Sequence, residues 1–407
     1  MFWWGSFIAF IAMIVIGYIE YRMGFPKPHY SPLGGSRYDD LTEFIPDFRF
    51  LHTAAFFKNP YTSSLSYPPF GAVLFAIVYA FGKPVAVYLA TAIIWLTASV
   101  WMVRRHLIRQ HISPITATLF PITTALFSFP IAGLIQRGNI ELYLWIFAAL
   151  GTWAFLNNKD DAAALLWSLA AATKLYPIVF LVLLLPRRKF RAFALGVISF
   201  VVVSTLSLWY LGPTIPIALR GSLANVFIYQ GVRTAEFGIH ELSANHSIFG
   251  LTKIFAVIIS VPSAKLTPFY YGLAAIVFAV IFFRRLANMP IANQLLAVSV
   301  FMVMLPPISY FYTLVNLYAP AIVLFFVAIR AERAHVEIRG LRTSVFLLIP
   351  LFGSFMLFTF PRVLLFGGLV QASLLILLFL WSATYPFAEP AQPTAIPPGT
   401  TPQVDFA

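Results

Sequence analysis

Charged side chains that could do chemistry are scarce in this chain, and they occur in two settings. Lys174 lies inside the otherwise apolar run 167–185. The long polar stretch after the first apolar segment carries carboxylates, among them Asp47 and the pair Asp39–Asp40. A carboxylate can take a proton from a hydroxyl group, and a cation at membrane depth can hold a phosphate and stabilise its developing charge. Together they suit a transferase with a lipid-phosphate-linked donor, and they suit an anion transporter equally well.

Further candidates gather in the stretch "QRGNIE", residues 136–141. Arg137 could hold a phosphate, or it could pair with Glu141 one helical turn on. Asn139 could bind a sugar, or it could cap the helix that starts there. A remaining group could bind the donor or acceptor, or could belong to a packed core or an aromatic belt at the membrane interface: Tyr67, Tyr176, His246, Tyr310 and Tyr312.

The composition points to a membrane. The 407 residues are 60% hydrophobic and only 10% charged, whereas soluble domains carry about 25% charged residues. This much apolar surface predicts an all-α polytopic membrane protein. The formal net charge of +13 does not indicate nucleic acid, because the basic residues occur in short runs between apolar segments, as cytoplasmic loops do.

Those basic runs also predict a topology. We place "RRHLIRQH" (104–111) and "RRKFR" (187–191) on the cytoplasmic side. Segment 112–135 then crosses outward and segment 139–157 crosses back, so segment 161–186 must begin and end on the cytoplasmic side. It would turn back at "KLYP" (174–177), where proline breaks the helix, and Lys174 would lie near the outer face. Segments 68–82 and 248–262 span only about 22 Å as helices, which predicts re-entrant or interfacial paths.

The chain reads as one transmembrane domain, residues 1–385, followed by a disordered Pro/Thr/Ala-rich tail, 386–407. Two outer loops interrupt it, at 20–67 and 212–247. The first apolar segment lacks a basic n-region and a cleavage site, which favours a retained helix over a signal peptide.

Several motifs, taken in order, resemble one family. The stretch 46–76, with Asp47-Phe48, Tyr61 and Tyr67-Pro68-Pro69, is similar to the first outer loop and following helix of polyprenyl-phosphate-mannose-dependent mannosyltransferases of the GT-C superfamily. Four more motifs resemble that family: "QRGNIE", "KLYP", "ANHSIFGL" (244–251) and "PPISY" (306–310). Five in the expected order over residues 40–330 carry more weight than any one of them.

The resemblance implies a GT-C-type bundle of about 11–13 membrane helices, some re-entrant, with an outer-face cavity. It implies an inverting glycosyltransferase that moves a sugar, with mannose favoured, from a polyprenyl-phosphate donor to a hydroxyl of a glycan or glycolipid acceptor. Asp47 would be the catalytic base, and Lys174 and Arg137 would bind the donor phosphate. The site would face the periplasm or exterior of the inner (plasma) membrane, in cell-envelope synthesis.

No cofactor is expected to be required, although the first-loop carboxylates could hold a divalent cation. Many relatives carry a histidine after the late aromatic residue, where this chain has Tyr310-Phe311-Tyr312-Thr313. The role that this histidine plays in the relatives is therefore open in this chain, or is taken by a tyrosine or by His246.

Two other functions stay open. A transporter or flippase of lipid-linked sugars usually shows paired repeats, and no partner to the interruption at "KLYP" is visible. An O-antigen polymerase or ligase is also polytopic, with long outer loops, but would not be expected to carry Asp47 so soon after the first helix. No nucleic-acid partner is expected.

Overall fold

The structure, a computed structural model, describes residues 38–42, 45–57, 67–236, 245–353 and 367–387. These residues form helices and no β-strand; a single isolated bridge joins Asn245 and Tyr310 within them. The predicted first helix and C-terminal tail lie outside the described residues. The elements are α2 (Asp39–Thr42), η1 (Ile45–Phe50), η2 (Ala54–Phe57), α3 (Pro69–Ala80), α4 (Pro84–Arg109), α5 (Pro114–Leu126), α6 (Phe129–Arg137), α7 (Glu141–Leu156), α8 (Asp160–Thr173), η4 (Tyr176–Leu184), α9 (Phe190–Leu211), α10 (Ile215–Glu236), α12 (Phe249–Ile258), α13 (Ser263–Arg284), η5 (Leu286–Asn288), α14 (Ile291–Met304), η6 (Phe311–Leu317), α15 (Tyr318–Arg333), α16 (Leu341–Phe352) and α17 (Gly367–Thr384).

The helices confirm an all-α polytopic membrane protein. In the described part of the chain, four helical stretches are long and apolar enough to cross a membrane: Pro84–Arg109, Phe190–Leu211, Ser263–Asn288 and Phe311–Arg333. The bent pair α5–α6 makes a fifth if it counts as one span. Many of the remaining apolar helices are shorter than a full crossing, so this bundle combines few full spans with many short helices.

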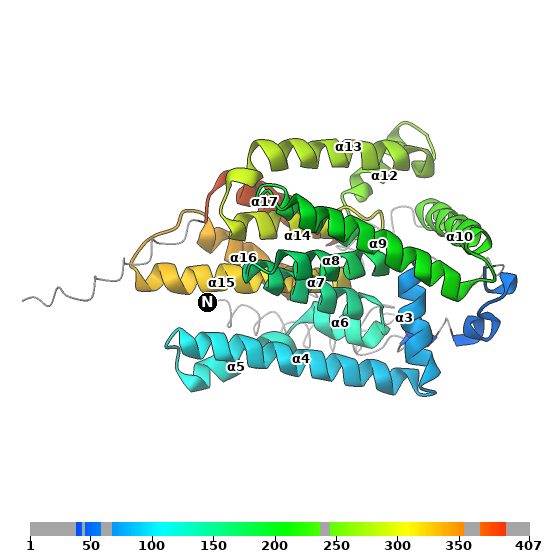
Figure 1. Cartoon of the computed structure of the whole chain (residues 1–407). Helices are drawn as coiled ribbons and strands as arrows, with labels where there is room; N and C mark the ends of the chain where they lie inside the picture. Colours follow the sequence, from blue (N-terminus) through cyan, green and yellow to red (C-terminus); the bar gives the residue numbers. More distant parts are fainter. Residues whose placement is uncertain (1–37, 43–44, 58–66, 237–244, 354–366, 388–407) are drawn as a thin grey trace, which may run out of the picture.

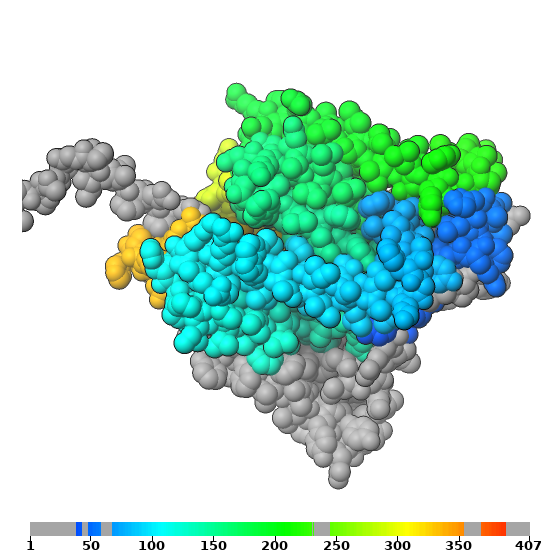
Figure 2. Space-filling model, turned by 60° about the horizontal axis from the view of Figure 1, so that its bottom comes forward, coloured from blue at the N-terminus to red at the C-terminus, as the bar shows by residue number. Residues whose placement is uncertain are grey.

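The short helices form its centre. Every residue of α14 from Ala292 to Met304 is buried, as expected for a helix enclosed on all sides. Neighbouring α8 packs between α7 and α9. By contrast, less than a quarter of the apolar window of α4, of α9 and of the α13 span is buried. These helices face outward (Figure 1), and Figure 2 shows α4 and α5, in cyan, covering one side of the molecule.

The predicted reversal at "KLYP" is confirmed. Helix α8 ends at Thr173, and η4 returns toward the end from which α8 started. The ion pair between Asp160, at the start of α8, and Arg187, just after η4, has a length of 3.6 Å. Lys174 is therefore at the far end of a helical hairpin. The basic ends of α4, α13 and α15 lie at the opposite end, on the left in Figure 1.

Two short segments and one loop that the sequence analysis singled out contain helices. The short segments 68–82 and 248–262 contain the short helices α3 and α12; their path relative to the membrane stays a prediction. The expected second outer loop, 212–247, contains the 22-residue helix α10. At Gly221 of α10 an added Cβ would overlap the Cβ of Phe57. The missing side chain lets α10 pack closely on η2, a contact that local composition cannot show.

Candidate active site

Helix ends converge on one buried polar cluster. Helix α6 ends at Arg137 because Gly138 adopts a left-handed conformation, φ +66°, which glycine tolerates best. Helix α7 begins at Glu141, and α8 gives way at Lys174, whose backbone is extended. Since α7 is 16 residues long, Glu141 is about 24 Å from the other end of α7, near which the hairpin of α8 and η4 begins.

At the centre of the cluster, Glu141 pairs with Lys174. The Glu141 side chain is fully buried and its Oε2 lies 2.7 Å from Nζ of Lys174, whose side chain is 15% exposed. The Tyr176 hydroxyl donates to both carboxylate oxygens, at 2.5 and 2.6 Å. Asn316 of η6 donates to Oε1 at 2.5 Å. A buried carboxylate thus has its charge compensated and its acceptor sites filled.

Asn139 links this pair to Asp40, in the segment predicted as the first outer loop. Its Oδ1 accepts from Lys174 at 3.2 Å and from the backbone N–H of Glu141 at 2.9 Å. Its Nδ2 donates to Asp40 at 2.6 Å and to the Tyr67 hydroxyl at 3.3 Å. Asn139 therefore bonds the first turn of α7, as a capping side chain does, and at the same time joins two charged groups.

Arg137 pairs with the first outer loop rather than with Glu141. Its Nη2 lies 2.8 Å from Oδ1 of Asp40, and its Nη1 lies 3.7 Å from Asp39. The sequence interpretation of an Arg137–Glu141 pair is wrong, because that pairing needs one continuous helix and Gly138 separates α6 from α7.

Aromatic rings surround the ammonium group of Lys174. It lies 5.4 Å from the ring centroid of Tyr67 and 5.5 Å from that of Tyr312, within the range of a cation–π contact. Burial, with a further contribution from the nearby Asp40 carboxylate, raises the pKa of the Tyr67 phenol well above its ordinary value. Tyr67 is therefore a neutral hydroxyl at physiological pH.

His246 and Tyr310 belong to an adjoining cluster. His246 lies 3.0 Å from the Ser309 hydroxyl and 3.1 Å from that of Thr313, and Tyr310 pairs with Asn245 through the backbone. Burial lowers the pKa of His246 to about 3, so it is neutral at pH 7. The Thr313 carbonyl accepts from Asn316 at 2.9 Å, and η6 thereby joins the two clusters.

Most of the predicted site residues are thus brought together. The main cluster contains Arg137, Asn139, Lys174, Tyr67, Tyr176 and Tyr312, and the adjoining one contains His246 and Tyr310. Asp47 belongs to η1, and its side chain lies outside the described residues. Sequence reasoning missed Asn316, which no local signal distinguishes from other asparagines.

Nothing in the described ranges suggests a metal centre. No group of three or more His, Cys, Asp or Glu side chains there is close enough to hold an ion. The carboxylates of the main cluster instead pair with Arg137 and Lys174. The cluster therefore has two carboxylate–cation pairs, Asp40–Arg137 and Glu141–Lys174.

A family model described as Glycosyltransferase family 87 matches residues 65–307 of the chain. The match includes Tyr67, Arg137, Asn139, Glu141 and Lys174, and ends before η6. No curated protein and no solved structure gave a match.

Proposed function

The chain belongs to glycosyltransferase family 87 and is a membrane-embedded transferase that takes a sugar donor and an acceptor; we propose that its donor is a polyprenyl-phosphate-linked sugar, with mannose favoured, and that it inverts the anomeric centre. The acceptor would be a hydroxyl of a glycan or glycolipid. Because basic loops mark the cytoplasmic side, the site at the opposite helix ends would face the exterior or periplasm.

The reaction follows from the charges in the cluster. The acceptor oxygen attacks the anomeric carbon as the bond from that carbon to the phosphate oxygen breaks. The acceptor proton passes to a carboxylate, and the polyprenyl phosphate leaves with one additional negative charge. Lys174 and Arg137 would stabilise this charge, and the tyrosine rings beside Lys174 suit a sugar face.

One observation supports this arrangement above the others. Asp40 and Lys174 lie on different segments of the chain, yet both bond the same side chain, Asn139, at 2.6 and 3.2 Å. An acid from the first outer loop and an ammonium group at a helix break are therefore neighbours. Cleavage of a sugar–phosphate bond by an acceptor hydroxyl would use the acid on the acceptor side and the ammonium group on the phosphate side.

Two first-loop carboxylates are candidates for the base. Asp47 is the residue that the family resemblance favours, and Asp40 is the one whose described side chain lies in the cluster. Asp40 keeps unused lone pairs beyond its bonds to Arg137 and Asn139. An entering phosphate would also compete with Asp40 for Arg137.

The all-helical fold of the described residues is compatible with a lipid-linked donor. Across the described residues there is no β-strand and hence no Rossmann-type sheet. A polyprenyl phosphate is itself a good leaving group, so such a donor needs no nucleotide site.

The test uses purified protein in detergent micelles with polyprenyl-phosphate [³H]mannose as donor and octyl mannoside or extracted membrane glycolipid as acceptor. Asp40→Asn and Asp47→Asn are compared with Asp161→Asn, whose carboxylate is 50% exposed and pairs with the exposed Arg191. Loss of the base should lower turnover by about 100-fold or more with donor binding retained.

The outcomes separate the alternatives. If only one first-loop variant loses turnover, that residue is the base. If wild type forms no glycosidic bond in micelles, but after reconstitution into vesicles moves the lipid donor from one leaflet to the other, the chain works as a flippase. Transfer from a nucleotide sugar in place of the lipid donor would overturn the proposed donor.

A further inference from the structure

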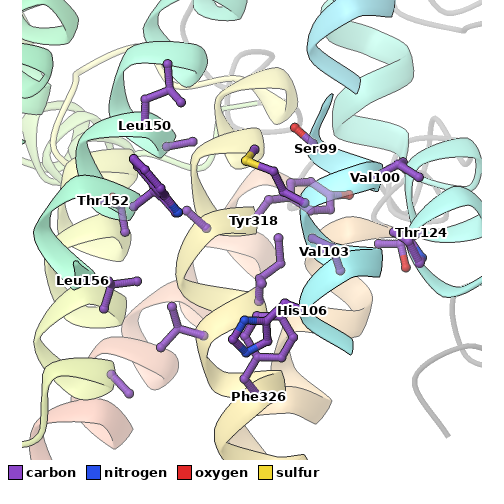
Figure 3. A pocket seen from close by; sticks show the side chains of 18 of the residues that line it. Ser99, Val100, Val103, His106, Thr124, Leu150, Thr152, Leu156, Tyr318 and Phe326 are labelled. Atoms are coloured by element: carbon purple, nitrogen blue, oxygen red, sulfur yellow. The ribbon is translucent and has the colours of Figure 1, made fainter. Parts of the chain in front are cut away.

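A second feature of the molecule is a large cavity. It has a volume of about 1090 Å³ and lies between α4, α5, α7, α14 and α15, partly open to the surface. This volume is slightly above the range of about 300–1,000 Å³ typical of ligand sites. Figure 3 shows Leu150 and Leu156 of α7 on one side of it and Val100 and Val103 of α4 on the other.

Most of the cavity wall is apolar. Aliphatic side chains alternate with the rings of Trp95, Trp145 and Trp153. Lining residues on α7 run from Trp145 to Leu156, a distance of about 16 Å along the helix axis. An elongated apolar space of this length matches an acyl chain better than a compact polar ligand.

One end of the cavity is basic. His106 and Arg109 line it from the last turn of α4, and Arg330 lines it from the last turn of α15. The His106 ring lies 4.0 Å from the ring of Phe326, and Nε of Arg330 donates to the Phe326 carbonyl at 3.4 Å. This contact holds the basic groups of the two helices side by side, as Figure 3 shows for His106 and Phe326.

No acidic residue is among the described residues that line the cavity. His106 and Arg109 are exposed at the end of α4, so the basic end opens toward the surface where the chain's basic runs gather. An apolar space that ends in a basic mouth is complementary to a molecule with a long hydrocarbon chain and an anionic head. Basic pockets between membrane helices bind anionic lipid headgroups in this way.

We propose that this cavity binds one anionic membrane phospholipid, with its phosphate at Arg109 and Arg330, beside His106, and an acyl chain along the tryptophan-lined wall. The basic mouth is separate from the polar cluster, because it lies at the opposite end of α7 from Glu141. The tail of a lipid donor held at Lys174 would bring no anion to this mouth. The proposal therefore does not depend on which donor the transferase uses.

The test is lipid binding to the purified, delipidated full chain by native mass spectrometry. Dioleoyl phosphatidylglycerol and dioleoyl phosphatidylcholine carry the same chains but differ in net charge. We expect one phosphatidylglycerol to bind at least tenfold more tightly than phosphatidylcholine. Arg109→Gln with Arg330→Gln should weaken phosphatidylglycerol binding about 25-fold, at roughly fivefold for each charge removed.

Arg105→Gln is the matched control, because Arg105 is an exposed arginine on the last turns of the same helix that does not line the cavity; it should change affinity less than twofold. Ala149→Trp fills the cavity and should weaken both lipids equally, which tests the site even if the double variant fails to fold. The proposal is overturned by equal binding of the two lipids, by a double variant that behaves like Arg105→Gln, or by loss of the lipid in Lys174→Ala.

Discussion

Replacing Glu141 by glutamine removes one charge from a fully buried ion pair while keeping the side chain's shape. Glu141 accepts from Lys174, Tyr176 and Asn316. A glutamine amide would turn one acceptor oxygen into a donor that faces another donor, and it would leave the ammonium group uncompensated. Breaking a buried pair in this way costs about 3–5 kcal/mol. Since Lys174 is 15% exposed, water screens part of its charge, and we expect a loss near 3 kcal/mol.

The assay is the free energy of unfolding in mixed micelles, followed by tryptophan fluorescence. Glu332→Gln is the control, because Glu332 is exposed in the last turn of α15; it should lie within about 0.5 kcal/mol of wild type. In the double variant Glu141→Gln/Lys174→Met both charges are gone, so it should recover about 2 kcal/mol relative to the sum of the single losses. Additive losses, or a Glu141→Gln loss no larger than that of the control, would refute the buried pair.

Two further changes test the surroundings of the site. Gly138 and Gly82 both have positive φ, but an added Cβ would lie 2.9 Å from Leu41 Cβ at Gly138 and within 4 Å of nothing at Gly82; Gly138→Ala should therefore lose about 1–3 kcal/mol more than Gly82→Ala in the same unfolding assay. The folded-state pKa of His246 is lowered to about 3, so below pH 6.5 the unfolded chain binds more protons than the folded one. As the pH falls from 6.5 to 4, the free energy of unfolding of the wild type should therefore decrease by about 1.4 kcal/mol per pH unit. His246→Gln should remove this part of the pH dependence, and an unchanged slope would contradict it.

Part of this site could be predicted from the sequence because lipid constrains it so strongly. An ammonium group in an apolar run is costly unless it is paired or lines a cavity. The basic runs 104–111 and 187–191, with two predicted crossings after the first run (112–135 and 139–157), require segment 161–186 to turn back. Those two facts place Lys174 at a helical break near one end of the bundle. The structure adds what they could not give, which is the identity of its partner, Glu141.

Other contacts could not be predicted, because they join residues that are far apart in the chain. Asp40 and Arg137 are separated by 97 residues and Glu141 and Asn316 by 175. Local spacing instead offered, as one alternative, the pairing of Arg137 with Glu141, four residues away, which one left-handed glycine prevents. Helix α10 was missed for a related reason, since its packing depends on the close approach of Gly221 to a distant phenylalanine.

The breaks in the helices and the polar cluster depend on each other. A helix interrupted among apolar helices leaves backbone N–H and C=O groups without partners, and such groups are costly away from water. At the junction of α6 and α7 the Tyr88 hydroxyl lies within bonding distance of the carbonyls of Leu134 and Asn139, at 3.0 and 3.2 Å, and the Asn139 side chain accepts from the Glu141 N–H. The Asn139 side chain that satisfies this junction also bonds Lys174. A chain that straightened the junction into one helix would gain backbone bonds but would lose the geometry that brings the first-loop acid to the ammonium group.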